Sequence, residues 1–217
     1  MMNDKYIIII SGPSGGGKTT VAEELIARLG NLEMSRSATT RAKRNDGKED
    51  EYVYLTVEEF RSSIASGDVL EYTEYSGNFY GTRKTEFERI FAMGKLPILV
   101  LDYVGVKSLR ESLDYPVYAF YIHTSLDEAR RRLEARDLIG EPSEKVKSTF
   151  ERRIAENRKD YAKLPELTER YDAFVKNDSL TDCIDEICNH LKELLRGGIP
   201  MTESEKRSVA QGLAEQA

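Results

Sequence analysis

The feature that most constrains the fold is a short apolar run, followed at once by a glycine-rich loop and then by a helical pattern. Residues 6–10 read Tyr-Ile-Ile-Ile-Ile, and a β-branched run of this length is typical of a strand buried on both faces. Beyond the loop, Val21, Leu25 and Leu29 recur about one helical turn apart, which predicts a helix. A strand buried on both faces indicates a parallel sheet covered by helices, and therefore an α/β fold.

The loop between this strand and this helix matches the phosphate-binding pattern G-x-x-x-x-G-K-[ST] in full. Glycines let backbone N–H groups wrap closely around a phosphate, and the helix N-terminus adds positive potential. A glycine-rich turn that binds nothing is the alternative, and the complete pattern in its strand-and-helix context disfavours it. Lys18 adds a cation at the β- and γ-phosphates, and the Thr19 hydroxyl can coordinate Mg²⁺ as cofactor. The predicted nucleotide-binding residues are Gly12, Pro13, Ser14, Gly15, Gly16, Gly17, Lys18, Thr19 and Thr20.

Composition excludes several classes of protein. A chain of 217 residues is long enough for one α/β domain with a small accessory lobe. A net charge of −6 and a pI near 5.2 argue against a nucleic-acid partner, because binding a phosphate backbone needs a positive face. No apolar run reaches the length of a signal-peptide core or a membrane span, so no membrane partner and a cytoplasmic location are expected. Cys183 and Cys188 are expected to be buried, reduced thiols.

The middle of the chain has the texture of an inserted lobe. Residues 32–81 hold short strand-like pieces, a charged loop and a helix that Thr56 and Glu59 open as a capping box. This pattern favours a small, mostly antiparallel lobe. The α/β alternation of the core occupies residues 5–31, 82–125 and 165–195.

The last third of the chain predicts a helical lid and a tail. Ser125 and Glu128 form a second expected capping box. The lid, at about residues 126–164, combines many basic residues with a narrow apolar stripe along one long helix. Residues 196–217 are polar, with little apolar material for packing, so a frayed or weakly helical tail is expected.

A basic stretch with several hydroxyls follows the first helix. Arg41 and Arg44 lie three residues apart in the sequence, beside Ser37, Thr39 and Thr40. Two guanidinium forks in this arrangement suit a phosphate, although a solvated basic loop has the same composition. From the residues alone, both interpretations stay open.

The order and spacing of several motifs resemble the guanylate kinase family. The resemblance covers about residues 5–195 and implies a P-loop kinase core with a parallel sheet flanked by helices, an inserted GMP-binding lobe and a lid. It also implies transfer of the γ-phosphoryl group of ATP to GMP (or dGMP), with no catalytic base, since a phosphate monoester is largely dianionic near neutral pH. The motifs are Ser37-Ala38-Thr39-Thr40-Arg41-x-x-Arg44, Tyr52, Glu71-Tyr72, Gly77-Asn78-Phe79-Tyr80-Gly81-Thr82 and Leu101-Asp102-x-x-Gly105.

The resemblance also implies a role for each matching residue. It implies that the GMP phosphate is bound by Arg41, Arg44, Tyr52 and Tyr80, and that the guanine is bound by Ser37, Glu71, Thr82 and Asp102. This chemistry is reasonable, because a carboxylate accepts from guanine N1–H and the 2-amino group together. Beside Lys18, the catalytic residues are Arg132, Arg136 and Arg153, which stabilise the charge of the transferring phosphate. Asn177 is implied near the adenine.

Two alternatives remain at this stage. One is a P-loop kinase for another small phosphorylated acceptor, because Val100 and Val104 replace polar residues usual in the family. The other is a non-catalytic binding domain of the same fold, which the intact P-loop opposes. The sequence does not determine the oligomeric state.

Overall fold

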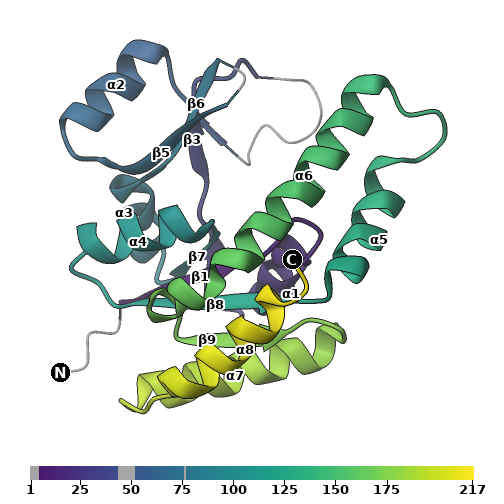
Figure 1. Ribbon diagram of the computed structural model, residues 1–217. Helices are drawn as coiled ribbons and strands as arrows, with labels where there is room; N and C mark the ends of the chain where they lie inside the picture. The colour runs from purple at the N-terminus through teal and green to yellow at the C-terminus, as the bar shows by residue number, and fades with distance from the viewer. Residues whose placement is uncertain (1–4, 44–51, 76) are drawn as a thin grey trace. The chain divides into compact units, whose positions relative to one another are not determined.

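The structure is a computed structural model that describes residues 5–43, 52–75 and 77–217. The chain divides into two compact units, each described by itself. The first comprises Met1–Ile9 and Leu25–Val117, and the second comprises Ile10–Glu24 and Tyr118–Ala217. Figure 1 labels the helices and strands.

A five-stranded sheet has the strand order β2-β7-β1-β8-β9. These strands are β1 (Ile7–Ser11), β2 (Leu32–Met34), β7 (Leu96–Val100), β8 (Val117–His123) and β9 (Ala173–Lys176). β2 pairs in parallel with β7, and β8 pairs in parallel with β9. The four consecutive isoleucines of β1 are fully buried, which confirms that a strand buried on both faces starts the fold.

The first unit also holds a four-stranded sheet in the order β4-β3-β6-β5. Its strands are β3 (Ser37–Thr39), β4 (Tyr52–Tyr54), β5 (Val69–Tyr75) and β6 (Asn78–Arg83). β3 and β4 are parallel, whereas β6 is antiparallel to both β3 and β5. This sheet is therefore mostly antiparallel, as the sequence predicts, and the α/β fold class is confirmed.

The three helices that lie wholly within the first unit are α2 (Val57–Ala65), α3 (Lys84–Ala92) and α4 (Tyr103–Ser112). Both halves of the predicted Thr56–Glu59 capping box are present. The α2 side chain Phe60 is buried against Ala38 and Val69 of the four-stranded sheet. One face of this small sheet is therefore apolar and covered.

The second unit holds the start of α1 (Lys18–Leu29), then α5 (Leu126–Asp137), α6 (Glu144–Lys163) and α7 (Leu180–Leu195). Two 3₁₀ turns, η2 (Leu164–Glu166) and η3 (Thr168–Arg170), connect α6 to β9. α7 contacts β9 (Figure 1). Its two cysteines are free and buried, as expected.

Two local predictions were wrong. Ser125 accepts from the Glu128 N–H, but the Glu128 carboxylate bonds Arg132 at 2.7 Å instead of completing a capping box. The tail forms a regular helix, α8 (Glu203–Ala214), with a complete capping box of Thr202 and Glu205. Buried Ala210 and Leu213 supply its packing face, so a few apolar residues at helical spacing are enough to order it.

Candidate active site

The glycine-rich loop joins β1 to α1 in a conformation that needs glycine. Gly12, Gly15 and Gly17 have φ angles of 148°, 80° and 88°, a region that other residues adopt only with strain. A Cβ atom at position 17 would lie 2.6 Å from the Asn177 side-chain nitrogen. The glycines of the pattern therefore serve both the turn and the close packing around it.

Lys18 bends back over the loop. Its Nζ donates to the Gly12 carbonyl at 2.9 Å and to the Pro13 carbonyl at 2.8 Å. The first turn of α1 carries no acidic residue, so the helix N-terminus keeps its positive potential. A cation and a helix N-terminus thus lie at one loop, an arrangement suited to binding polyphosphate.

Two predicted residues from distant segments lie at this loop. Asn177 donates from Nδ2 to the Gly16 carbonyl at 2.7 Å. Arg132 donates from Nη2 to the Asn177 backbone carbonyl at 2.9 Å, while its Nε bonds Glu128. Hydrogen bonds therefore join the P-loop, α5 and the segment that follows β9.

A further side chain brackets the loop and was missed by sequence reasoning. Asn157 of α6 accepts from the Ser14 N–H and donates to the Ser14 carbonyl, both at 2.8 Å. It is 2% exposed, so this amide is part of the packed interior. A polar residue beside the apolar stripe of α6 was the available signal, but nothing in the sequence shows which segment it meets.

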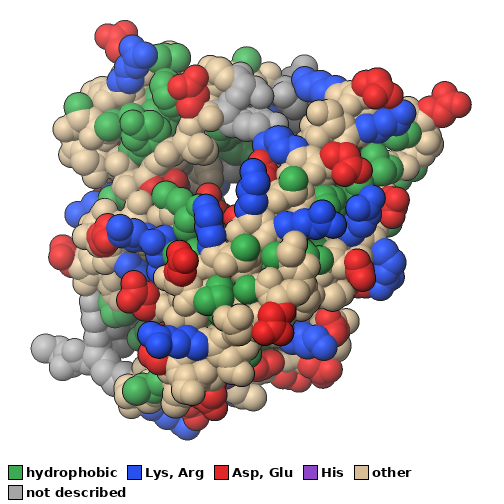
Figure 2. All heavy atoms as spheres, viewed as in Figure 1, with side chains coloured by type: hydrophobic (Ala, Val, Ile, Leu, Met, Phe, Trp, Pro, Cys, Tyr) green, Lys and Arg blue, Asp and Glu red, His purple; other side chains and the backbone are tan. Residues whose placement is uncertain are grey.

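The other two predicted lid arginines meet at one carboxylate. Arg136 donates to Asp137 at 2.7 and 3.1 Å, and Arg153 donates to the same carboxylate at 2.5 Å. Arg136 contributes most to lowering the pKa of Asp137, and Arg153 adds to it. In the described part of the chain, these arginines bond Asp137 rather than the P-loop. Figure 2 shows Lys and Arg side chains along α5 and α6, mixed with Asp and Glu.

On the small sheet of the first unit, strand register gathers the predicted acceptor residues. Ser37 pairs with Tyr52, Thr39 with Tyr80, and Glu71 with Thr82. Directly paired residues share a face, and alternate residues of one strand do as well. The predicted residues Ser37, Tyr52, Glu71, Tyr80 and Thr82 therefore lie on one face, opposite the face that α2 covers.

An arginine with an unused donor lies among tyrosines in this unit. The Arg41 guanidinium is 5.1 Å from the centre of the Tyr52 ring, and its Nη2 lies 3.5 Å from the Tyr54 hydroxyl. Contact with Tyr54 raises the pKa of Arg41. Its buried Nε has no hydrogen-bond partner among the described residues. A buried cationic donor of this kind suits an anion. Arg44, the predicted second fork, lies outside the described residues.

Two carboxylates interact at the other end of the same face. Thr82, which is 2% exposed, donates to Glu71 at 2.5 Å. Burial raises the pKa of Glu71, and the charge of Asp102 raises it further. Asp102 caps α4, because its Oδ1 accepts from the Val104 and Gly105 N–H groups at 2.9 Å each. A carboxylate with a raised pKa gains most from a ligand that brings N–H donors.

Comparison with known proteins decides the family. The sequence profile described as guanylate kinase matches residues 4–197. The chain is 35% identical over 175 residues to a guanylate kinase of Thermosynechococcus vestitus, covering 80% of this chain and 86% of that one. It is 38% identical over 185 residues to a guanylate kinase of Porphyromonas gingivalis, covering 83% and 93%.

The chain belongs to the guanylate kinase family. The crystal structure of a guanylate kinase from Anaplasma phagocytophilum agrees, with a TM-score of 0.57 and 29% identity over 91% of this chain and 88% of that one. Membership confirms the resemblance and makes the chain a nucleotide kinase. The comparisons give no support to the alternatives of another acceptor or of a non-catalytic domain.

Kinases of this type generally use a divalent metal, and the residues of this guanylate kinase family member fit one. Thr19 is exposed in the first turn of α1. No group of three or more His, Cys, Asp or Glu residues in the described ranges is arranged to hold a metal ion. A hydroxyl beside a phosphate site suits a metal held largely by substrate oxygens and water.

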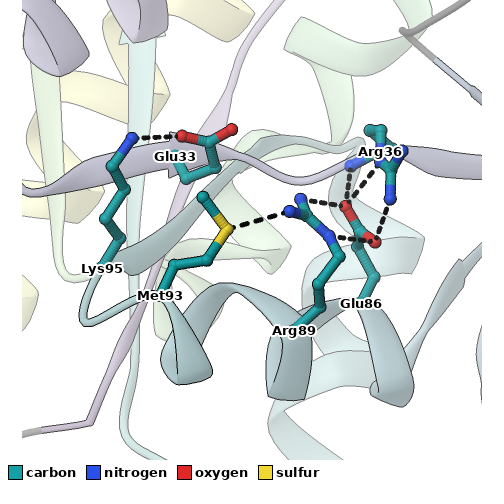
Figure 3. A network of polar contacts seen from close by, with 6 residues as sticks. All are labelled: Glu33, Arg36, Glu86, Arg89, Met93 and Lys95. Atoms are coloured by element: carbon teal, nitrogen blue, oxygen red, sulfur yellow. Dashed lines mark hydrogen bonds and ion pairs between the residues drawn. The ribbon is translucent and has the colours of Figure 1, made fainter.

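A second residue set that sequence reasoning missed surrounds Glu86 of α3 (Figure 3). The Arg36 backbone N–H and guanidinium donate to its carboxylate at 3.0 to 3.2 Å, and Arg89 adds bonds of 3.0 and 2.8 Å. Although Glu86 is buried, Arg89 and Arg36 lower its pKa to about 2. Arg36 immediately precedes β3, whose start lies beside the end of β6, and Glu86 belongs to the helix that follows β6, so this cluster ties one end of the acceptor face to α3. In the described residues, no helix is long and apolar enough to cross a bilayer.

Proposed function

We propose that this chain is an active guanylate kinase that transfers the γ-phosphoryl group of ATP to GMP, or to dGMP, and releases ADP and GDP. The supporting observation is the acceptor face of the small sheet. There, strand register aligns Glu71, Thr82 and Ser37 with the tyrosines, while the buried Nε of nearby Arg41 has no partner in the described part of the chain. These residues offer hydrogen-bond acceptors to the edge of guanine and hydrogen-bond donors to a phosphate.

Guanine fits the chemistry at Glu71 better than adenine does. Guanine presents N1–H and a 2-amino group, so an ionised Glu71 and Asp102 would accept bonds that compensate their close approach. Adenine presents an N1 lone pair there, and a partly buried carboxylate facing an acceptor loses about 1–3 kcal/mol. The Thr82 hydroxyl could then turn from Glu71 toward O6.

The donor residues suit phosphoryl transfer by charge and position. In the proposed complex, Lys18 exchanges its bonds to the Gly12 and Pro13 carbonyls for oxygens of the β- and γ-phosphates. Arg132 already lies at the loop, whereas Arg136 and Arg153 would have to exchange Asp137 for phosphate. Such cations act mainly by stabilising charge as it moves to the leaving group.

We assign Mg²⁺ to the Thr19 hydroxyl. When bound there, the ion would supply positive charge that offsets the negative charge developing on the phosphates. Thr20 and Asn177 complete the proposed ATP site, in which Asn177 keeps the loop in shape through Gly16. No protein base is needed, because the acceptor phosphate is already largely dianionic near neutral pH.

A coupled assay of ADP release across GMP, dGMP, AMP, UMP and CMP tests the proposal. The expected result is turnover with GMP and dGMP and a kcat/KM for the other acceptors at least about 100-fold lower, as two unpaired carboxylates imply. Faster use of another acceptor would support the other-acceptor kinase. ATP binding without turnover of any of the five would support the non-catalytic domain.

A further inference from the structure

The C-terminal helix lies beyond the part of the chain that defines the family. The family profile ends at residue 197, and α8 (Glu203–Ala214) follows it. Within the second unit, α8 packs against α6, η2, η3 and β9 (Figure 1). Its neighbours are therefore the segments that carry side chains to the P-loop.

A buried lysine fixes α8 in this position. Lys206 is 7% exposed, and its Nζ donates to the Tyr171 backbone carbonyl at 2.9 Å while pairing with Glu203 of its own helix. A buried ammonium group is costly unless it is paired and hydrogen-bonded. This requirement specifies both the rotation of α8 and its contact with the residue after η3.

The residue that Lys206 holds reaches the strand before the P-loop. The Tyr171 hydroxyl lies 3.1 Å from the Ser11 Oγ, and both residues are 1% exposed. Ser11 is the last residue of β1 and immediately precedes Gly12. The Tyr171 ring also packs against Tyr121 and Phe174, with ring centres 5.1 and 5.6 Å away, so it has little freedom to move.

A second connection runs through α6. α8 packs against α6, and α6 carries Asn157, whose amide brackets the Ser14 peptide at 2.8 Å on both sides. Tyr171 therefore contacts Ser11, the residue that immediately precedes the P-loop, and Asn157 contacts Ser14 within the loop. Both contacts come from segments against which α8 packs.

We propose that α8 is a positioning element of the proposed ATP site, in which Lys206 acts on the P-loop through Tyr171 and Ser11. The inference rests on the proposed function in one respect, since it takes the P-loop as the ATP site. Loss of the Lys206 contact is expected to weaken the use of ATP and to leave the use of GMP nearly unchanged, because the acceptor face is built from other segments. A helix that only adds stability would shift the thermal midpoint without this selectivity.

The test compares Lys206→Met with Arg207→Met, an exposed neighbour on the same helix, and with Tyr171→Phe. The phenylalanine keeps the ring and the backbone carbonyl but removes the hydroxyl that meets Ser11. KM for ATP and KM for GMP are measured for the full chain below its thermal transition, with ATP affinity measured by calorimetry in the absence of GMP. KM and Kd for ATP should rise about three- to tenfold in Lys206→Met and Tyr171→Phe, as one lost hydrogen bond implies. KM for GMP should stay within about twofold, and Arg207→Met should match the unmodified chain.

Unchanged ATP affinity in folded Lys206→Met and Tyr171→Phe would overturn the inference, as would an equal rise in both KM values. If Lys206→Met does not fold, unchanged ATP affinity in folded Tyr171→Phe still overturns the inference, because the proposed route from Lys206 to the P-loop runs through the Tyr171 hydroxyl. If the unmodified chain turns over no acceptor, the proposed function fails, and the calorimetric ATP affinities still decide the role of α8.

Discussion

The residues of the proposed ATP site and those of the proposed GMP site are held in opposite ways. In the second unit, side chains from three segments already bond the P-loop: Asn157, Asn177 and, from the loop itself, Lys18. On the acceptor face of the first unit, the Arg41 Nε has no hydrogen-bond partner within residues 5–43, 52–75 and 77–217, and burial raises the pKa of Glu71. At the proposed ATP site, the named side chains already have hydrogen-bond partners in the protein. At the proposed GMP site, the Arg41 Nε and the Glu71 carboxylate would gain hydrogen bonds and compensating charge from a ligand of the right chemistry.

This difference suggests where rate and selectivity originate. Cations that bind the transferring phosphate contribute to the chemical step by stabilising charge as it moves, and Lys18, Arg136 and Arg153 would first exchange their bonds to protein oxygens for phosphate. Buried polar groups without hydrogen-bond partners favour the ligand that supplies those partners, because any other ligand leaves their desolvation cost uncompensated. Substitutions at the proposed ATP site should therefore mainly lower turnover, and substitutions at the proposed GMP site should mainly change the KM and the selectivity for the phosphoryl acceptor.

The largest effect is expected at Lys18. Lys18→Ala should lower turnover by about two orders of magnitude or more, as loss of a phosphate-binding cation implies. Steady-state rates at saturating ATP and GMP measure this effect. Equal thermal midpoints are the control for folding, and near-normal turnover of a folded variant would remove the P-loop from the mechanism.

The next largest effect is expected at Arg41. Arg41→Ala removes a charge-assisted contact to the acceptor phosphate worth about 1.5–3 kcal/mol, so KM for GMP should rise about 10- to 100-fold. ATP affinity measured without GMP should not change. Lys43→Ala is the matched control, because Lys43 is an exposed cation two residues away. A parallel loss of ATP affinity would contradict the assignment of Arg41 to the acceptor phosphate.

A smaller effect is expected at the cluster in Figure 3. Glu86→Gln should lower the free energy of unfolding by about 1–3 kcal/mol, because two arginines lose the charge they pair with, and should raise KM for GMP only a few-fold. Exposed Glu88→Gln on the same helix is the control.

The pH dependence gives a second check on this cluster. The folded-state pKa of Glu86 is lowered from 4.5 to about 2, so its ionised form stabilises the fold fully above pH 4.5 and loses this contribution as the pH falls toward 2. The stability gap between the unmodified chain and Glu86→Gln should therefore be constant near neutral pH and shrink in acid. A gap that widens in acid would mean that the carboxylate is not the stabilising form.

Local patterns in the sequence predicted the P-loop segment of the proposed ATP site, but not the contacts that distant segments make with it. The P-loop, its buried strand and its helix form one continuous segment, so glycine, lysine and apolar spacing suffice to predict them. Register on the small sheet was not predicted: Glu71 and Thr82 came from the family resemblance, and their direct pairing across β5 and β6 is a finding of the structure. Family resemblance, rather than composition, supplied Arg132 and Asn177.

Residues that act across long sequence separations were not predictable. Asn157, Glu86 and Lys206 each bond a partner at least 35 residues away in the chain, and no local pattern specifies such a partner. The order of α8 was missed for a related reason, since the surface that its short apolar face covers is built by α6 and β9. The second capping box was half wrong because an arginine one turn onward competed for Glu128.

The most direct test of the account is the ratio of kcat/KM for GMP to kcat/KM for AMP, measured from pH 5 to 8 in the unmodified chain and in Glu71→Gln. The ratio cancels the ionisation that both acceptor phosphates share. The pKa of Glu71 is raised above 4.5, and only its ionised form accepts from guanine N1–H and the 2-amino group together, so the ratio should decrease as the pH is lowered. Glu71→Gln should reduce the ratio at least tenfold at pH 8, as an unmet buried carboxylate implies, and should remove its pH dependence. An unchanged ratio in folded Glu71→Gln would contradict the claim that this carboxylate selects guanine.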